Sequence, residues 1–233
     1  MSGFLQANDQ ARQLPQLAAE PLPQAFRAEA VSLYHSDGRP LLRDLQLELQ
    51  PGQALLVKGP SGAGKTTLLR ALAGLWPYVE GQLQRPTGNQ ALFLSQWPYL
   101  PLGDLASAIA YPAYYQSEQR SRLVQLLDQL QLGHLRDQLD VQADWSRILS
   151  IGEQQRLAFA RVLLNQPQMV FLDESTSAMD EDLEDVIYQL LRSELPDCIL
   201  FSVGHRNTLD RFHSYALALD GKGGWSFAAM AQA

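Results

Sequence analysis

The sequence predicts an α/β fold with a mostly parallel sheet, an N-terminal antiparallel β subdomain and an inserted helical subdomain. Two observations carry this prediction. Short apolar runs typical of buried strands alternate with helical patterns along the chain, and one such run leads into a glycine-rich loop followed by a helix. The chain has 233 residues, of which 46% are hydrophobic and 18% charged. It is therefore long enough to bury a core and too apolar to be a disordered tail.

Composition and charge exclude several classes of protein. Cys198 is the single cysteine, so a disulfide scaffold is excluded. The 25 acidic residues exceed the 18 basic ones and give a net charge of −7, so we expect no nucleic-acid partner. No apolar run approaches the roughly 18 residues of a membrane span, and the N-terminus lacks the pattern of a secretion signal. We expect a soluble domain that faces the cytosol.

The N-terminal region is predicted to be a linker followed by strands. Residues 1–26 are rich in Gln, Ala and Pro, and we expect a linker or a disordered N-terminus there. The folded domain is predicted to span residues 27–233. Its first strands are predicted at residues 30–34, 41–49 and 53–58, with turns at the Asp-Gly pair 37–38 and the Pro-Gly pair 51–52.

The middle of the chain, about residues 97–165, is predicted to be the helical subdomain. Leucines recur at helical spacing within residues 117–131, and Ser117 is the expected N-cap of that helix. A second helix is predicted from about residue 152 to 164, before Pro167. The other predicted elements are a helix ending near residue 73, strands at 91–95, 169–172 and 198–203, and a helix at 180–195.

Residues 59–66 read GPSGAGKT and match the phosphate-loop pattern G-x-x-x-x-G-K-[ST]. Glycines let such a loop aim its backbone N–H groups at phosphate oxygens, and the following helix adds positive potential. Lys65 is expected to contact the β- and γ-phosphates, and the Thr66 hydroxyl to hold Mg²⁺. The loop alone is compatible with a kinase, a GTPase, an AAA-type motor or an ABC ATPase. The predicted nucleotide-binding residues here are Gly59, Pro60, Ser61, Gly62, Ala63, Gly64, Lys65, Thr66 and Thr67.

An acidic pair ends the predicted strand at residues 169–172, within the segment MVFLDE. We expect Asp173 to bind the metal, directly or through water, and Glu174 to act as the general base that activates a water molecule. An acidic pair after a strand more often caps a helix. The phosphate loop about 110 residues earlier favours the metal site instead.

Residues 149–154 read LSIGEQ and continue into QRLAFARVLL, which resembles the signature motif of ABC-type ATPases. A serine and a glycine at a helix start offer a hydroxyl and free N–H groups, which make a second anion site; the serine is also the expected N-cap. The resemblance implies that Ser150 and Gly152 face the nucleotide of a partner subunit, and that two chains enclose two ATP molecules head to tail.

Other positions resemble functional residues of the same family. Gln96 is similar to the Q-loop glutamine, which links the γ-phosphate and Mg²⁺ to the transmembrane partner. Residues 177–180, SAMD, resemble the D-loop, with Met179 in place of the usual Leu and Asp180 as its acid. His205 is similar to the switch histidine that contacts the γ-phosphate and orients the attacking water.

The residue expected to stack on adenine lies near the end of the strand predicted at residues 30–34. Family members often use a tyrosine in a segment similar to residues 31–38, VSLYHSDG. The register puts His35 at the stacking position. Neighbouring strand residues point to opposite faces, so Tyr34 could stack only if the strand slips or bulges.

Three stretches, residues 74–83, 95–112 and 149–164, resemble the nucleotide-binding domain of subfamily-D-like half-transporters. That group includes peroxisomal acyl-CoA transporters and bacterial relatives that move peptides, cobalamin or other solutes. Ser95, Trp97 and Asp104 depart from its usual pattern. The resemblance implies a six-helix membrane domain, encoded separately or lost from the same chain by truncation or excision.

The predicted function is ATP binding and hydrolysis in a domain or subunit of an ABC transporter, with Mg²⁺ as cofactor. The expected partners are a transmembrane domain and a second ATP-binding domain, at the cytoplasmic face of the cell membrane. One alternative is a soluble ABC ATPase of DNA repair or translation, which the single phosphate loop, the single cysteine and the acidic charge disfavour. Another is a domain that binds ATP without hydrolysing it. The cargo depends on the membrane domain.

Overall fold

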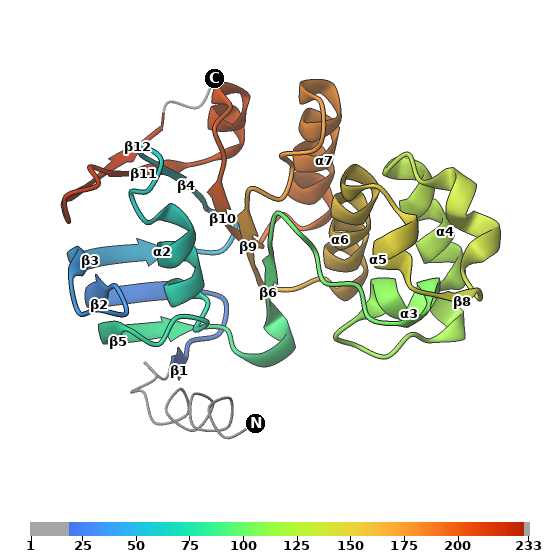
Figure 1. The fold of residues 1–233 in the computed structure, drawn as a ribbon, viewed down its shortest axis with the longest axis horizontal. Coiled ribbons are helices and arrows are strands. Elements are labelled where there is room, and N and C mark those ends of the chain that lie inside the picture. The colour runs from blue at the N-terminus through green and yellow to red at the C-terminus, as the bar shows by residue number, and fades with distance from the viewer. Residues whose placement is uncertain (1–18, 231–233) are drawn as a thin grey trace.

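The computed structural model describes residues 19–230, in which a six-stranded sheet forms the centre (Figure 1). The strand order is β12-β11-β4-β10-β9-β6, and only the β11–β12 pair is antiparallel. The prediction of a mostly parallel sheet is therefore confirmed. Its strands are β4 (Ala54–Lys58), β6 (Ala91–Leu94), β9 (Met169–Asp173), β10 (Ile199–Val203), β11 (Tyr215–Leu219) and β12 (Trp225–Ala229).

A second sheet, of order β1-β5-β2-β3, is the predicted antiparallel subdomain. β2 pairs antiparallel with both β3 and β5, whereas β1 runs parallel to β5. Residues 1–18 of the predicted linker lie outside the described residues, but Glu20 and Pro21 already pair with β5. The chain thus joins the sheet before residue 27. The strands are β1 (Glu20–Pro21), β2 (Phe26–Tyr34), β3 (Pro40–Leu49) and β5 (Val79–Arg85).

The helices of the middle region gather at one end of the molecule (Figure 1). Ser117 is not the N-cap predicted above, because a 3₁₀ turn precedes the helix and Gln116 forms the capping box with Gln119. A short strand pair, β7 (Gly103–Asp104) and β8 (Gln142–Ala143), also lies in this region. The α-helices are α2 (Lys65–Leu72), α3 (Leu105–Ala110), α4 (Arg120–Gln129), α5 (Trp145–Ile148), α6 (Ile151–Asn165) and α7 (Glu181–Glu194). The 3₁₀ helices are η1 (Gly88–Gln90), η2 (Ser117–Gln119), η3 (Gly133–Gln138) and η4 (Asn207–Phe212).

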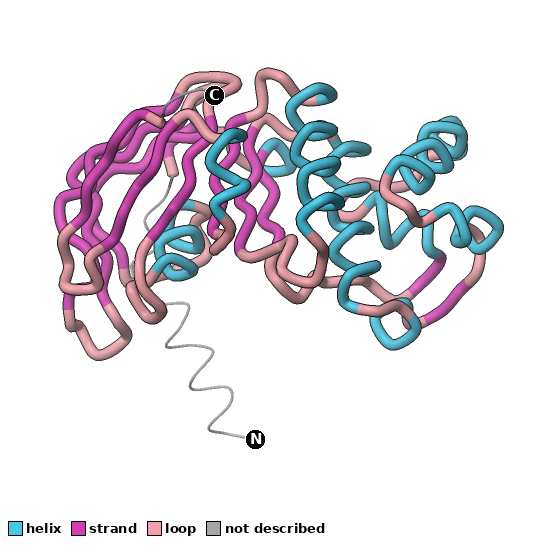
Figure 2. Tube along the Cα trace, turned by 90° about the horizontal axis from the view of Figure 1, so that it is seen from above, coloured by secondary structure: helices cyan, strands magenta, loops and turns pink. Residues whose placement is uncertain are grey.

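The middle strands of the central sheet, β4, β10 and β9, are buried on both faces, as their continuous apolar sequences predict. Leu55 and Phe201 pack with α2 and the antiparallel sheet, whereas Leu56 and Leu200 pack with α6 and α7. Figure 2 shows the two larger sheets on one side of the molecule and the helical subdomain, with the short β7–β8 pair, on the other. Within residues 19–230, no helix combines the length and the apolar composition that crossing a membrane requires.

Candidate nucleotide site

Three neighbouring parallel strands place the predicted site residues at one edge of the central sheet. β4 leads into loop 59–66, β9 ends at Asp173, and β10 ends two residues before His205. The register pairs Val203 with both Val57 and Asp173. Because parallel strands end at the same edge, the loop, the acidic pair and the histidine meet there.

Loop 59–66 has the backbone geometry of an anion cradle. Gly64 has a φ of +90°, and a Cβ there would lie only 2.3 Å from the Leu41 side chain, so glycine is required. Lys65 is 7% exposed, and its Nζ donates to the carbonyls of Gly59 at 2.9 Å and Pro60 at 3.0 Å. The Lys65 ammonium group thus lies across the loop at the N-terminus of α2, and this arrangement favours phosphate binding.

Two predicted metal ligands are in direct contact. The Thr66 hydroxyl donates to Asp173 Oδ1 at 2.7 Å. Burial raises the pKa of the Asp173 carboxyl, an effect that the bond from Thr66 opposes. Hydroxyl and carboxylate oxygens are ligands that Mg²⁺ accepts, and a divalent cation would offset the cost of burying this carboxylate. These residues therefore fit a Mg²⁺ ion.

Gln96, the third predicted metal ligand, is exposed. Among the described residues, no hydrogen bond joins its side chain to Thr66 or Asp173. Its backbone carbonyl instead accepts from Gln155 Nε2 at 2.8 Å. The structure thus ties the Gln96 backbone to α6, and the role of the Gln96 side chain stays a prediction.

Glu174 and His205 form a pair at the edge of the sheet. His205 Nε2 lies 3.2 Å from Glu174 Oε1, and their side chains are 64% and 31% exposed, respectively. Glu174 has a φ of +50°, in the left-handed region that disfavours non-glycine residues. Its N–H donates to the Val203 carbonyl at 3.1 Å, which fixes this backbone against β10. The pair lines a hollow of about 170 Å³ together with Thr176, Ser177, Glu184, Gly204 and Arg206.

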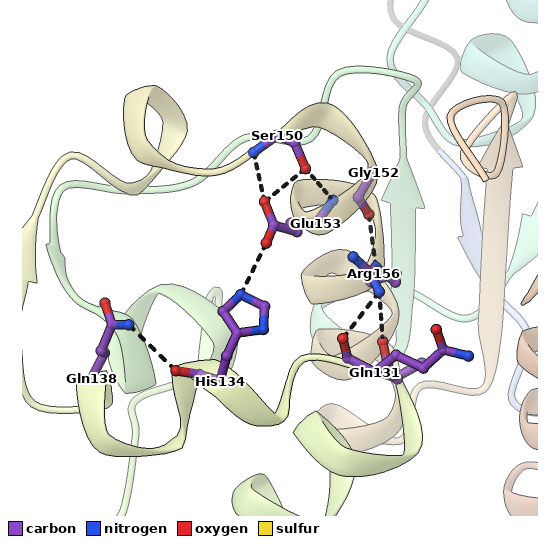
Figure 3. A network of polar contacts seen from close by, with 8 residues as sticks. Gln131, His134, Gln138, Ser150, Gly152, Glu153 and Arg156 are labelled. Carbon is purple, nitrogen blue, oxygen red and sulfur yellow. Dashed lines mark hydrogen bonds and ion pairs between the residues drawn. The ribbon is translucent and has the colours of Figure 1, made fainter.

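Ser150 is the N-cap of α6, as predicted, and forms a capping box with Glu153 (Figure 3). A Cβ on Gly152 would lie 3.0 Å from the Ala178 carbonyl oxygen, so the first turn of α6 lies against the D-loop. Asp180 caps α7 by accepting from the Leu183 N–H at 2.8 Å. Within the described part of the chain, no hydrogen bond joins Ser150 or Gly152 to loop 59–66. The structure therefore groups the signature residues with the D-loop.

Sequence reasoning missed Gln155, which links these loops. Its side chain is fully buried; Nε2 donates to the Gln96 carbonyl and to Ser177 Oγ at 3.2 Å, and Oε1 accepts from the Ala178 N–H at 3.1 Å. The available signal was helical spacing, because Gln155 lies four residues before the buried Phe159 and shares its face. One amide therefore joins the Q-loop, the signature helix and the D-loop.

The expected adenine-stacking residue, His35, lies in the turn after β2, where its N–H donates to the Arg39 carbonyl at 2.9 Å. The Tyr34 hydroxyl donates to Glu80 Oε2 at 3.1 Å, on β5. The β2–β3 register shifts between Leu33 and Tyr34, which is the irregularity that Tyr34 would need in order to stack. His35 therefore stays a prediction, with Tyr34 as its alternative.

The residues that depart from the family pattern have local structural roles. Ser95 Oγ donates to the Trp97 carbonyl at 2.6 Å. Asp104 caps α3 by accepting from the Ser107 N–H at 2.7 Å. Met179 is 5% exposed within the core and packs as a leucine would.

Comparison with known proteins agrees with this arrangement. The family model for the ABC transporter matches residues 42–177, which include the phosphate loop, the signature motif and the acidic pair. The chain belongs to the ABC transporter family. It is an ATP-binding component of an ABC transporter, and the resemblance that the sequence indicated is confirmed.

Several relatives of this ABC chain are considerably longer. An uncharacterized ABC transporter ATP-binding protein of Haemophilus influenzae is 48% identical over 97% of this chain and 38% of that protein. The human lysosomal cobalamin transporter ABCD4 is 40% identical over 89% of this chain and 36% of that protein. Human ATP-binding cassette sub-family D member 3 is 37% identical over 87% of this chain and 32% of that protein. The ABC chain thus spans about a third of their lengths.

A bacterial Atm1-family ABC exporter, solved with ATP bound, superposes with a TM-score of 0.76. The match covers 98% of this ABC chain and 44% of that one, at 23% sequence identity. This likeness confirms the predicted fold.

Proposed function

We propose that the chain hydrolyses ATP and that hydrolysis powers the movement of a solute by a membrane domain. The observation that carries this proposal is the direct contact of Glu174 with His205 beside the contact of Thr66 with Asp173. Asp173, the candidate metal ligand, is the last residue of β9, and Glu174, the candidate base, follows it directly beside the phosphate loop.

In the proposed reaction, Lys65 and the loop N–H groups bind the β- and γ-phosphates. Thr66 and Asp173 hold Mg²⁺, which when bound neutralises phosphate charge. The Glu174 carboxylate accepts the proton of the attacking water. His205 holds that carboxylate in place, contacts the γ-phosphate and orients the attacking water.

The site is completed by a second copy of the chain. Ser150 is exposed at the start of α6 and lies with the D-loop, so its hydroxyl and the N–H groups of the first turn can face another subunit's nucleotide. We therefore propose a head-to-tail dimer around two Mg-ATP. The chain would work at the cytoplasmic face of the cell membrane, attached to a transmembrane domain that is fused or separate.

The test is Glu174→Gln, which keeps the side-chain shape and removes the base. We expect the ATP hydrolysis rate to fall by at least about 100-fold, with ATP still bound and an ATP-dependent dimer now stable enough to detect by light scattering. Glu118→Gln, an exposed change in η2, is the matched control and should hydrolyse ATP at the wild-type rate. Wild-type turnover by the Glu174→Gln variant would refute the assignment of the base.

A further inference from the structure

The hydroxyl of Ser150 is already engaged within its own subunit. Glu153 Oε2 accepts from the Ser150 N–H at 2.8 Å and from Ser150 Oγ at 2.7 Å (Figure 3). The Glu153 N–H in turn donates to Ser150 Oγ at 3.3 Å. An ionised carboxylate can only accept, so the single hydroxyl proton of Ser150 points toward Glu153.

This arrangement conflicts with binding a phosphate. A phosphate oxygen also needs a hydrogen-bond donor, and Ser150 has one proton to give. Contact with the nucleotide of a partner subunit therefore requires the proton to turn away from Glu153. It also brings two negative groups to opposite sides of one hydroxyl, where they repel each other.

His134 acts on the other oxygen of the same carboxylate. Its Nε2 lies 2.9 Å from Glu153 Oε1. Burial favours a raised pKa for the Glu153 carboxyl, but hydrogen bonds from Ser150 and His134 outweigh it and hold the pKa below its ordinary value. Glu153 is therefore ionised at neutral pH, and Nε2 must be the nitrogen that carries the proton.

The helix that presents Ser150 also holds the segment that carries His134. Arg156 of α6 donates to the Gln131 carbonyl at 3.1 Å and, through Nε, to the Gly152 carbonyl at 3.3 Å (Figure 3). Gln131 has a φ of +55°, which turns the chain from α4 toward η3. The Arg156 side chain thereby ties the first turn of α6 to the backbone just before η3, which carries His134.

We propose that His134 is a positioning residue for the signature serine. By donating to Glu153 Oε1 it takes up part of the carboxylate charge, and this frees the Ser150 hydroxyl to donate to a phosphate oxygen of the partner's ATP. The inference rests on the proposed head-to-tail dimer. It assigns to η3, which carries His134, a role in stabilising that dimer.

The test is a double-mutant cycle of His134→Ala and Glu153→Gln in the Glu174→Gln protein, which needs no hydrolysis. The readout is the ATP concentration that gives half-maximal dimer, measured by light scattering. We expect His134→Ala to raise it about fivefold. Glu153→Gln removes the carboxylate charge. In that background, His134→Ala should change the ATP concentration for half-maximal dimer by less than about twofold.

Three controls separate this role from a structural one. Affinity for ADP, which has no γ-phosphate to reach a partner, should not change in His134→Ala. His134→Gln keeps a donor on Nε2 and should restore most of the lost dimerisation. Arg136→Ala removes a neighbouring ion pair with Asp128 in the same 3₁₀ segment and should have no effect.

The outcomes distinguish the two proposals. If the Glu174→Gln protein forms no dimer with ATP, the proposed function fails and the role of His134 fails with it. If the dimer forms, the inference is overturned when His134→Ala leaves the ATP concentration for half-maximal dimer unchanged. The inference is also overturned if His134→Ala raises the ATP concentration for half-maximal dimer by the same factor with Glu153 present as with Gln at position 153.

Discussion

The carboxyl edge of the central sheet and the helical subdomain each carry part of the candidate site, but different bonds hold them. At the edge, β4, β10 and β9 are joined by continuous backbone pairing between strands that are buried except at Lys58, the last residue of β4. In the helical subdomain, single side chains hold the backbone. Arg161 Nη2 donates to the Tyr99 and Ala108 carbonyls, both at 2.9 Å, and Asn165 donates to the Ala110 carbonyl at 3.0 Å.

This difference has a consequence for mutation. A backbone ladder does not depend on any one side chain, whereas a carbonyl satisfied by one buried side chain loses its partner when that residue changes. We therefore expect single substitutions to detach the helical subdomain while the phosphate loop still binds nucleotide.

The largest effect is expected at Arg161. Burial lowers the pKa of this guanidinium to about 10, and its charge lies against carbonyls and 5.5 Å from the centre of the Tyr111 ring. Arg161→Met leaves two carbonyls without a donor and should lower the free energy of unfolding by about 3 kcal/mol, measured in urea. Arg147→Ala, which removes a pair with Asp144 on a side chain that is 86% exposed, should cost less than about 0.5 kcal/mol. Equal losses of unfolding free energy in Arg161→Met and Arg147→Ala would contradict the view that buried side chains hold the helical subdomain.

A second prediction concerns a buried network of side chains that packs against β10 in the sheet region. Behind β10, the Tyr188 hydroxyl donates to Ser202 Oγ at 3.1 Å, and Ser202 lies 2.7 Å from His213 Nε2. His213 Nδ1 donates to the Leu209 carbonyl at 2.7 Å, so Nε2 is left as the acceptor and the ring is neutral. Burial lowers the pKa of His213 to about 4.

Because the folded pKa of His213 lies below the ordinary value near 6.5, the unfolded chain binds more protons on acidification. The contribution of His213 to the free energy of unfolding should therefore be fully present above pH 6.5. It should fall as the pH drops toward 4, with a loss of about 2 kcal/mol at pH 5. Urea unfolding between pH 7 and 5 measures this loss. His213→Gln should flatten the dependence, and a profile that His213→Gln leaves unaltered would show that other groups cause it.

The smallest effect is expected at Gln155, where the two regions meet. Gln155→Leu keeps the volume but removes the bonds to Gln96, Ser177 and Ala178. We expect ATP turnover to fall about tenfold while ADP affinity stays the same, because the loop that binds ADP is held by the sheet. Gln125→Leu removes only the contact with Arg122 on the exposed face of α4, and should leave turnover nearly unchanged. A lower ADP affinity in Gln155→Leu would contradict the separation of the two regions.

Local patterns were sufficient to predict much of the fold and the site. The glycine-rich loop before α2, the acids that end β9 and the serine cap of α6 each depend on a few consecutive residues, and the structure has all three. β5 was missed because its segment VEGQLQR has few apolar residues, and it forms a strand only by pairing with β2. There Gly81 is needed, since a Cβ would lie 2.6 Å from the Ala30 carbonyl oxygen.

The sequence by itself determined that the phosphate loop, the acidic pair and His205 meet at the carboxyl edge, because residues that follow parallel strands come together wherever those strands pair. Only the tertiary structure decided that Gln155 joins two loops and that His134, which no motif marks, lies beside Glu153. These contacts join residues that are far apart in the chain, and their geometry depends on how helices pack. Side-chain spacing along one helix shows which face is buried, but the tertiary structure places another segment against that face.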